Sequence, residues 1–232
     1  MLRISKTLII GFLVAALVLG FVGATIVAES LYERSLTARL PVSPLVKGAE
    51  EGASLTFIGD SRVAQWANHD NFEARYLGFP GATSNQIELF LTRNPTEGEV
   101  VVIQLGVNDL RVLGIRPELV DDIVSMVSNS IQRIAILLSL RYESVIILGV
   151  FPVAEAEVLR RPVWSKTVGA AVELVNGNLE GMTYPSNAEF VSTSQIFAGL
   201  EDRAFRDTLH VTESAYFELN ILLQDVLSDA LQ

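Results

Sequence analysis

The sequence contains no cysteine and only two histidines, His69 and His210, in 232 residues. Without cysteine there is no disulfide framework, no thiolate metal site, no cysteine nucleophile and no cysteine that could carry a lipid. Two histidines also exclude a zinc site that is built on several histidine ligands. Any chemistry that needs an imidazole must therefore use one of these two side chains.

Basic residues are scarce as well, with 17 Lys and Arg against 27 Asp and Glu. The first 28 residues contain Arg3, Lys6 and no acid, so the other 204 residues hold 15 bases and 27 acids, a net charge of −12. Such a body repels phosphate backbones, and we expect no nucleic-acid partner. The hydrophobic share of 50% excludes a disordered or collagen-like chain.

An uncharged run, Thr7 to Ala28, opens the chain. As a helix it reaches about 33 Å, enough to cross a hydrocarbon core of about 30 Å, and it exceeds the roughly 7–15 apolar residues of a cleaved signal peptide. Residues 1–28 therefore predict a membrane anchor, with cleavage after Ile26-Val27-Ala28 and release of the protein as the alternative. Arg3 and Lys6 flank the run and favour a body outside the cytoplasm, periplasmic or extracellular.

Residues 29–53 are polar and hold Pro41 and Pro44, so they predict a tether, and residues 54–232 predict one folded domain. Short apolar runs in this domain alternate with helical patterns. The expected strands are residues 55–58, 72–79, 100–105, 144–150 and 189–196.

Three expected helices begin at recognisable residues. Thr83 with Gln86 forms a capping box before a helix at 84–92, Pro117 opens an amphipathic helix, and Thr212 precedes a final helix to about residue 231. Strands that alternate with helices imply a mostly parallel sheet that is covered on both faces. The sequence thus predicts a three-layer α/β/α sandwich with a flavodoxin-like, five-stranded sheet and one N-terminal transmembrane helix.

Polar residues follow the expected strands at the edge where parallel sheets hold their active sites. The segments are Gly59-Asp60-Ser61-Arg62, Gly78-Phe79-Pro80-Gly81-Ala82, Gly106-Val107-Asn108-Asp109 and, before the final helix, Asp207-Thr208-Leu209-His210. Each segment alone is common, but their order and shared position predict one active site.

These four segments resemble the sequence blocks of the SGNH/GDSL hydrolase superfamily, over about residues 54–216. The resemblance implies an esterase in which Ser61 is the nucleophile, Asp207 and His210 complete the triad, and Gly81 and Asn108 complete the oxyanion hole with Ser61. Two residues depart from the pattern: Arg62 stands where the GDSL motif has leucine, and Tyr76 stands where the second block often has asparagine.

The residues support the same triad independently of the resemblance. A serine hydroxyl needs a neighbouring base, and histidine has the fitting pKa. His69 lies eight residues after Ser61, about 12 Å along a helix, in a segment that reads as a solvated loop. His210 remains as the base, and Asp207 three residues earlier can hold its other ring nitrogen.

An ester carbonyl under attack becomes an oxyanion, which needs preformed donors. Gly81 offers a backbone N–H on a tight turn, Asn108 a side-chain amide, and Ser61 its own N–H. Gly81 closing a Pro-Gly turn and Asn108 capping the next segment are the structural alternatives. We expect Asp60 to stabilise its turn, and Arg62 and Trp66 to line the entrance or, more commonly, to be an exposed arginine and a packed tryptophan.

The expected activity is hydrolysis or transfer of an acyl ester, with an O-acetyl group on a glycan as the first substrate class. A lipase or thioesterase activity and a catalytically idle glycan-binding domain are the alternatives. No metal and no organic cofactor is implied. A flavin site would need several small hydroxylated or glycine residues after the first strand, whereas Ser61 is followed by Arg62, Val63 and Ala64.

Overall fold

The protein is described by a computed structural model that covers residues 6–37, 42–49, 53–69, 72–155 and 166–230. These residues form one sheet of six strands in the order β1-β3-β2-β4-β5-β6. The strands are β1 (Leu45–Gly48), β2 (Leu55–Gly59), β3 (Ala74–Gly78), β4 (Gly98–Gln104), β5 (Tyr142–Leu148) and β6 (Ala188–Val191). All neighbours pair in parallel except β1, which is antiparallel to β3.

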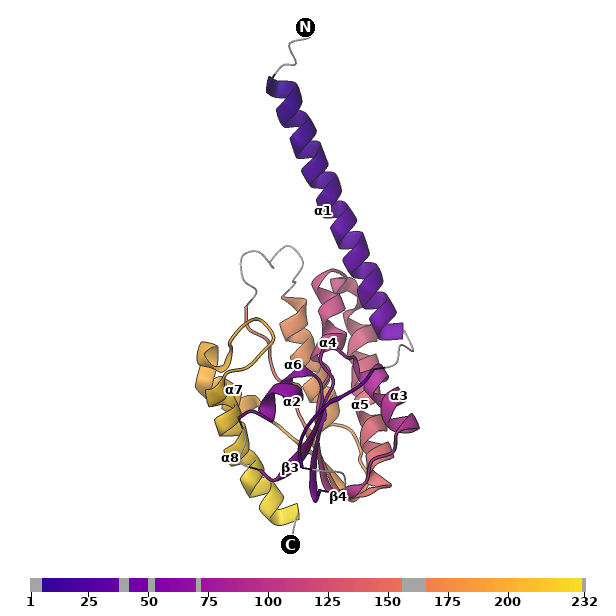
Figure 1. The fold of residues 1–232 in the computed structure, drawn as a ribbon, viewed down its shortest axis with the longest axis vertical. Coiled ribbons are helices and arrows are strands. Elements are labelled where there is room, and N and C mark those ends of the chain that lie inside the picture. The colour runs from indigo at the N-terminus through magenta and orange to yellow at the C-terminus, as the bar shows by residue number, and fades with distance from the viewer. Residues whose placement is uncertain (1–5, 38–41, 50–52, 70–71, 156–165, 231–232) are drawn as a thin grey trace.

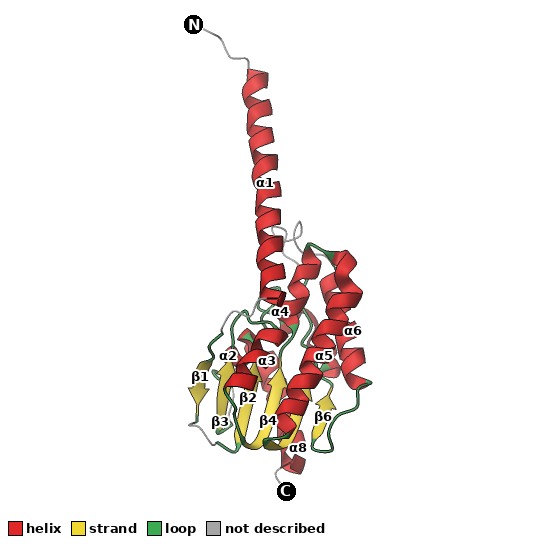
Figure 2. Cartoon of the chain, turned by 90° about the vertical axis from the view of Figure 1, so that its right-hand side faces the viewer, coloured by secondary structure: helices red, strands yellow, loops and turns green. Residues whose placement is uncertain are grey.

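The five parallel strands follow the flavodoxin-like order 2-1-3-4-5 when they are counted along the chain. Helices cover both faces of this sheet (Figures 1 and 2). One face carries α3 (Ser84–Arg93), α5 (Val120–Ser139) and α6 (Thr167–Glu180), and the other carries α2 (Ser61–Trp66), α7 (Ser194–Leu200) and α8 (Glu213–Ala230). The predicted three-layer α/β/α class is confirmed.

Two hydrophobic clusters, one on each face of the sheet, form the core. Along β4, Val101 and Ile103 belong to the cluster under α3, α5 and α6, while Val100 and Val102 belong to the cluster under α2, α7 and α8. Successive side chains of a strand point to opposite faces, so a strand that is covered on both sides is apolar throughout. This is why residues 100–105 read as a continuous hydrophobic run.

The expected helix starts are found in the structure. Gln86 Oε1 accepts a hydrogen bond from the Thr83 N–H at 3.0 Å, which is one half of the predicted capping box. Pro117 opens a short 3₁₀ turn, η2 (Pro117–Leu119), that leads directly into α5. The last helix, α8, begins immediately after Thr212.

The predicted tether and strand count need correction. Helix α1 (Lys6–Thr37) continues nine residues past Ala28, because no proline or glycine interrupts the chain between Ala28 and Leu40. Residues 45–48 then form β1, which adds a sixth strand by pairing with the outer edge of β3. A four-residue, mostly exposed edge strand has too little hydrophobic periodicity to be recognised from sequence. Residues 38–41 and 50–52 lie outside the described part of the chain.

The expected strand at 189–196 is also shorter than predicted. β6 ends at Val191, and α7 begins at Ser194. The polar residues Ser192 and Thr193 separate the two elements, and Phe197 of α7 is buried in the core. Ile196 therefore belongs to the first turn of a helix and does not extend the strand.

Helix α1 leaves the domain and rises away from it (Figure 1). Its window Ile10–Val27 is apolar and long enough to cross a membrane, and none of this window is buried against the rest of the chain. A helix with this composition is a candidate membrane span or signal anchor.

Helix α2 packs so closely on the sheet that glycine is required beneath it. A Cβ on Gly78 would lie 2.5 Å from the backbone N and Cα of Ala64. We predict that Gly78→Ala lowers the free energy of unfolding by about 1–3 kcal/mol, since the helix must shift to make room. Chemical denaturation measures this change.

The control is Gly177→Ala in α6, where an added Cβ meets no atom within 4 Å. This substitution should leave stability unchanged or raise it by up to about 1 kcal/mol, because alanine is the better helix former. Equal stabilities for the two variants would show that α2 does not pack as closely as described.

Candidate active site

Three loops meet at one edge of the sheet because their strands are in register. Gly59, the last residue of β2, is paired with Gly78 of β3 on one side and Gln104 of β4 on the other. The residues that follow, including Ser61 and Asn108, therefore emerge side by side from the carboxyl ends of parallel strands. This is the edge at which the sequence predicted an active site.

Ser61 is the first residue of α2, and the turn that presents it is stabilised by Asp60. Asp60 is the N-cap of α2, and its Oδ1 accepts a hydrogen bond from the Arg62 N–H at 2.9 Å. Burial raises the pKa of Asp60, although the Arg62 guanidinium and this backbone hydrogen bond oppose the rise. The geometry fits the structural role that we expected for Asp60.

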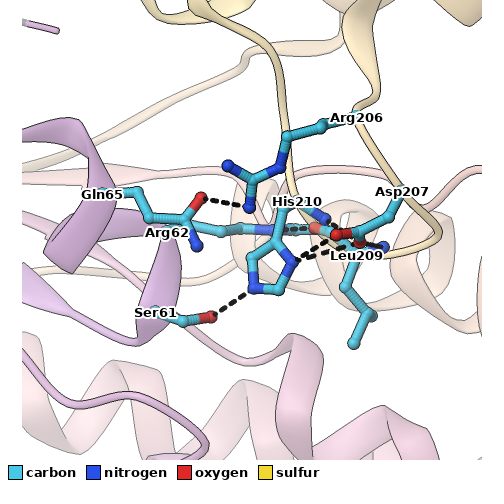
Figure 3. A network of polar contacts seen from close by, with 7 residues as sticks. All are labelled: Ser61, Arg62, Gln65, Arg206, Asp207, Leu209 and His210. Carbon is cyan, nitrogen blue, oxygen red and sulfur yellow. Dashed lines mark hydrogen bonds and ion pairs between the residues drawn. The ribbon is translucent and has the colours of Figure 1, made fainter. Parts of the chain in front are cut away.

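Ser61, His210 and Asp207 form a continuous chain of polar contacts (Figure 3). The Ser61 Oγ lies 3.3 Å from the His210 Nε2. On the other side of the ring, the Nδ1 lies 2.8 Å from one Asp207 carboxylate oxygen and 3.1 Å from the other. The structure thus brings together three residues that are separated by up to 149 positions in the sequence.

The Asp207 carboxylate is held as an anion. Partial burial raises its pKa, but hydrogen bonds from the Leu209 N–H, the His210 ring and the His210 N–H outweigh burial and lower the pKa to about 2. An ionised Asp207 favours the tautomer of His210 that carries its proton on Nδ1. The Nε2 lone pair then faces the Ser61 hydroxyl and can accept its proton.

Asn108 and Gly81 lie on the two neighbouring loops, which are joined by hydrogen bonds. The Asn108 Nδ2 donates to the Ala82 carbonyl at 3.1 Å, which orients the amide and leaves its second N–H for another acceptor. Gly81 has φ +77°, a conformation that favours glycine. Gly106 has φ +118° and makes the turn that leads into α4 (Val107–Leu110), where Asn108 lies.

Asp109 provides a second link between these loops. Its carboxylate is fully buried and accepts hydrogen bonds from both the N–H and the hydroxyl of Ser84, at 2.7–3.1 Å. Burial raises the pKa of Asp109 to about 7, although the bonds from Ser84 lower it. Asp109 therefore positions the start of α3 through these bonds to Ser84.

His210 and not His69 is the imidazole beside Ser61, as expected, but His69 is half-buried against α8 and does not stand in a fully solvated loop. Its ring stacks on Tyr216 with the centroids 5.2 Å apart, and its carbonyl accepts a hydrogen bond from Asn220. Residues 70 and 71 lie outside the described part of the chain. The aromatic partner comes from α8, far along the sequence, so local composition could not reveal it.

Arg62 is the residue whose importance sequence analysis missed. Its side chain is fully buried, whereas we considered it an entrance or exposed residue. The guanidinium donates three hydrogen bonds to backbone carbonyls, with Nε to Leu209 at 2.8 Å, Nη1 to Phe151 at 2.6 Å and Nη2 to Pro152 at 2.8 Å. Trp66, in contrast, is fully buried, as expected for a packed tryptophan.

These bonds connect the helix that carries Ser61 to the loop that carries His210. Leu209 directly precedes His210, so Arg62 restrains both partners of the 3.3 Å Ser61–His210 contact. Burial lowers the pKa of Arg62 below its usual value, and the nearby Asp60 opposes this effect only in part. The three carbonyls that accept from Arg62 belong to residues distant in the sequence. Near Arg62 itself, only the closeness of Asp60 in the sequence could have indicated that the arginine is buried.

The part of the chain that the structure describes holds no group of three or more His, Asp or Glu side chains arranged to bind a metal ion.

Comparison with known proteins shows the fold. No family model matches the sequence, and no curated protein matches it significantly. Among solved structures, a Streptococcus pneumonia protein described as a platelet activating factor has a TM-score of 0.57 at 19% identity, covering 94% of this chain and 99% of its own.

Two further structures are similar. A Bacteroides fragilis protein described as an acylhydrolase has a TM-score of 0.53 at 18% identity, covering 80% of this chain and 92% of its own. An acetylxylan esterase from Geobacillus stearothermophilus has a TM-score of 0.52 at 16% identity, covering 76% of this chain and 94% of its own. At these identities the comparisons establish a shared architecture.

The buried guanidinium generates a testable prediction. Arg62→Met would leave three carbonyls without their donor and Asp60 without its neighbouring charge. We predict a loss of about 3–5 kcal/mol in the free energy of unfolding. Urea denaturation measures this loss.

Arg203→Met is the matched control, because Arg203 is exposed and makes one long hydrogen bond to the Gly199 carbonyl. Its effect should stay within about 0.5 kcal/mol. A small loss for Arg62→Met, similar to that of Arg203→Met, would contradict the structural role assigned to Arg62.

Proposed function

We propose that the protein is a serine ester hydrolase of the SGNH type. The observation that carries this proposal is the Ser61–His210–Asp207 chain of contacts at the carboxyl edge of a parallel sheet. A serine hydroxyl, a base within reach and a carboxylate that orients the base are the parts that nucleophilic acyl transfer needs.

In this mechanism the His210 Nε2 takes the proton of Ser61 as the Oγ attacks the ester carbonyl carbon. The carbonyl oxygen becomes an oxyanion, which receives hydrogen bonds from the N–H groups of Ser61 and Gly81 and from the Asn108 amide. His210 then returns the proton to the departing alcohol, which leaves an acyl group on Ser61. Water, activated by the same imidazole, releases the acid and restores the serine.

An O-acetyl group on a glycan is the substrate class that we favour. One structural neighbour is an acetylxylan esterase, and catalytic mutants of that protein replace a serine and an aspartate by alanine. Another neighbour is described as an acylhydrolase. These descriptions agree with the polar residues at the strand ends and support ester hydrolysis in this chain.

We place the catalytic domain outside the cytoplasm, held by α1. The apolar window of α1 is exposed along its length and has the composition of a membrane span. The bases Arg3 and Lys6 precede it and favour a cytoplasmic N-terminus.

The triad generates the first test. Ser61→Ala and His210→Ala should each lower kcat for a soluble acetyl ester by about 10⁴–10⁶, because the two residues act as one unit. Asp207→Asn should retain more activity than either. An acetyl ester assay and labelling by a fluorophosphonate probe give the two readouts.

His69→Ala is the control, since it removes the other imidazole of the chain, which stacks on Tyr216 whereas His210 lies beside Ser61. Its kcat should equal that of the unmodified protein. Undiminished turnover by a folded Ser61→Ala variant, or a large loss in His69→Ala alone, would refute the mechanism.

The oxyanion donors generate a second test. Asn108→Ala should lower kcat by about 10²–10³ and change KM far less, because the amide acts mainly on charge that develops in the transition state. Steady-state kinetics separate the two parameters. A variant with raised KM and normal kcat would make Asn108 a substrate-binding residue.

Membrane anchoring has its own test. The full-length protein should remain in the membrane fraction after an alkaline carbonate wash, and a reporter fused after Gln232 should be active only outside the cytoplasm. A mature protein whose first residue is Glu29 would show cleavage of the segment and release.

A further inference from the structure

The position of α1 relative to the active site has a consequence for the substrate. The carboxyl ends of the parallel strands carry Ser61, Gly81 and Asn108, and α1 meets the domain at this same end. It approaches α3, which begins at Ser84 shortly after the Gly81 turn, and the 3₁₀ turn η1 (Arg111–Gly114), which follows Asn108. The two elements next to α1 thus continue directly from two of the active-site loops.

The position of β1 also indicates that α1 joins the domain at the carboxyl ends of the parallel strands. The chain passes from α1 to Leu45, which is paired with Gly78 at the carboxyl end of β3. In Figure 2, β4 points toward the end of the domain from which α1 rises. The C-terminus lies at the far end of the molecule in both views (Figures 1 and 2).

The length of α1 sets the distance between this edge and a bilayer. Between the end of the apolar window at Val27 and the end of the helix at Thr37 lie ten helical residues, which span about 15 Å. The polar interface of a bilayer takes up about 5–8 Å of this distance. The loops of the proposed active site lie next to the C-terminal end of α1. They would therefore be close to the lipid headgroups.

Electrostatic attraction does not explain why the domain would lie close to a membrane. The 204 residues after the anchor carry a net charge of −12, so an anionic membrane surface would repel the domain. The helix continues without glycine or proline from Thr25 to Thr37, which makes it a stiff connection. Proximity to the membrane would come from this helix.

We infer that the active site faces the membrane that α1 crosses, and that its substrate is an acyl ester carried by a membrane-attached molecule. This inference rests on the proposed esterase activity and on the anchoring of α1. A substrate fixed in the same bilayer needs only a short reach to Ser61, whereas a site on the opposite end of the domain would lie a further domain diameter, about 40 Å, away.

The test uses full-length protein in phosphatidylcholine vesicles with three probes. Two are a fluorogenic acetyl ester coupled to the headgroup of phosphatidylethanolamine through spacers that reach about 15 Å or about 60 Å. The third is the same ester without lipid. We expect the two lipid-coupled esters to be hydrolysed at rates within about threefold of each other, because both spacers reach the site.

A helix insertion moves the site and keeps its chemistry. Eighteen helix-forming residues inserted after Ala28 add five full turns, so the domain keeps its rotational orientation and rises by about 27 Å. Hydrolysis of the short-spacer ester should then fall at least about tenfold, since its reach no longer spans the gap. The long-spacer and soluble esters should be hydrolysed as before.

The outcomes separate the two proposals. Hydrolysis of the soluble and long-spacer esters without hydrolysis of the short-spacer ester would overturn the membrane-facing orientation and leave the esterase intact. An insertion that does not affect the short-spacer ester would overturn it too. Failure to hydrolyse the soluble ester would refute the proposed activity itself, and the inference with it.

Discussion

The parallel register of β3, β2 and β4 is the constraint on which the site depends. Gly59 is paired with both Gly78 and Gln104, so the loops that follow these three strands start at the same height. The backbone ladder is continuous and buried between two layers of helices, which leaves it little freedom to slip. Ser61, Gly81 and Asn108 become neighbours through this ladder, although they are far apart in the sequence.

Buried polar groups then hold the loops in place above the ladder. Asp109 binds the first residue of α3, Asn108 binds the Ala82 carbonyl, and Arg62 binds carbonyls of two further loops. Each of these groups is costly to bury without a partner, so the loops must adopt the conformations that satisfy them. The Ser61–His210 distance is therefore set by a network that reaches well beyond the two residues.

The same edge also receives α1, so the direction in which α1 leaves the domain and the position of the candidate active site are connected. A helix that entered from the amino ends of the strands would support the same fold and the same triad. If α1 spans a bilayer as we propose, that arrangement would turn Ser61 away from the membrane. Under the proposed function, the place where α1 joins the domain therefore affects substrate access, while the proposed Ser61–His210–Asp207 triad determines the reaction.

The fold class, the residues at the strand ends and the N-terminal helix could be predicted from the sequence. The alternation of apolar strands with amphipathic helices determined the α/β class, because burial on both faces leaves a local signature such as residues 100–105. The places of Ser61 and Asn108 after the ends of β2 and β4 were predicted from the apolar runs that precede them, and α1 was predicted from an uncharged run of sufficient length. These features are encoded in neighbouring residues.

Other features were decided by tertiary structure alone. The edge strand β1 depends on backbone pairing with β3, the burial of Arg62 depends on carbonyls at Phe151, Pro152 and Leu209, and the stacking of His69 depends on α8. The sequence also does not show whether α1 joins the domain at the carboxyl ends of the parallel strands or at the opposite edge. The physical reason is common to all of them: each contact joins residues that are distant along the chain, and such contacts leave no local pattern.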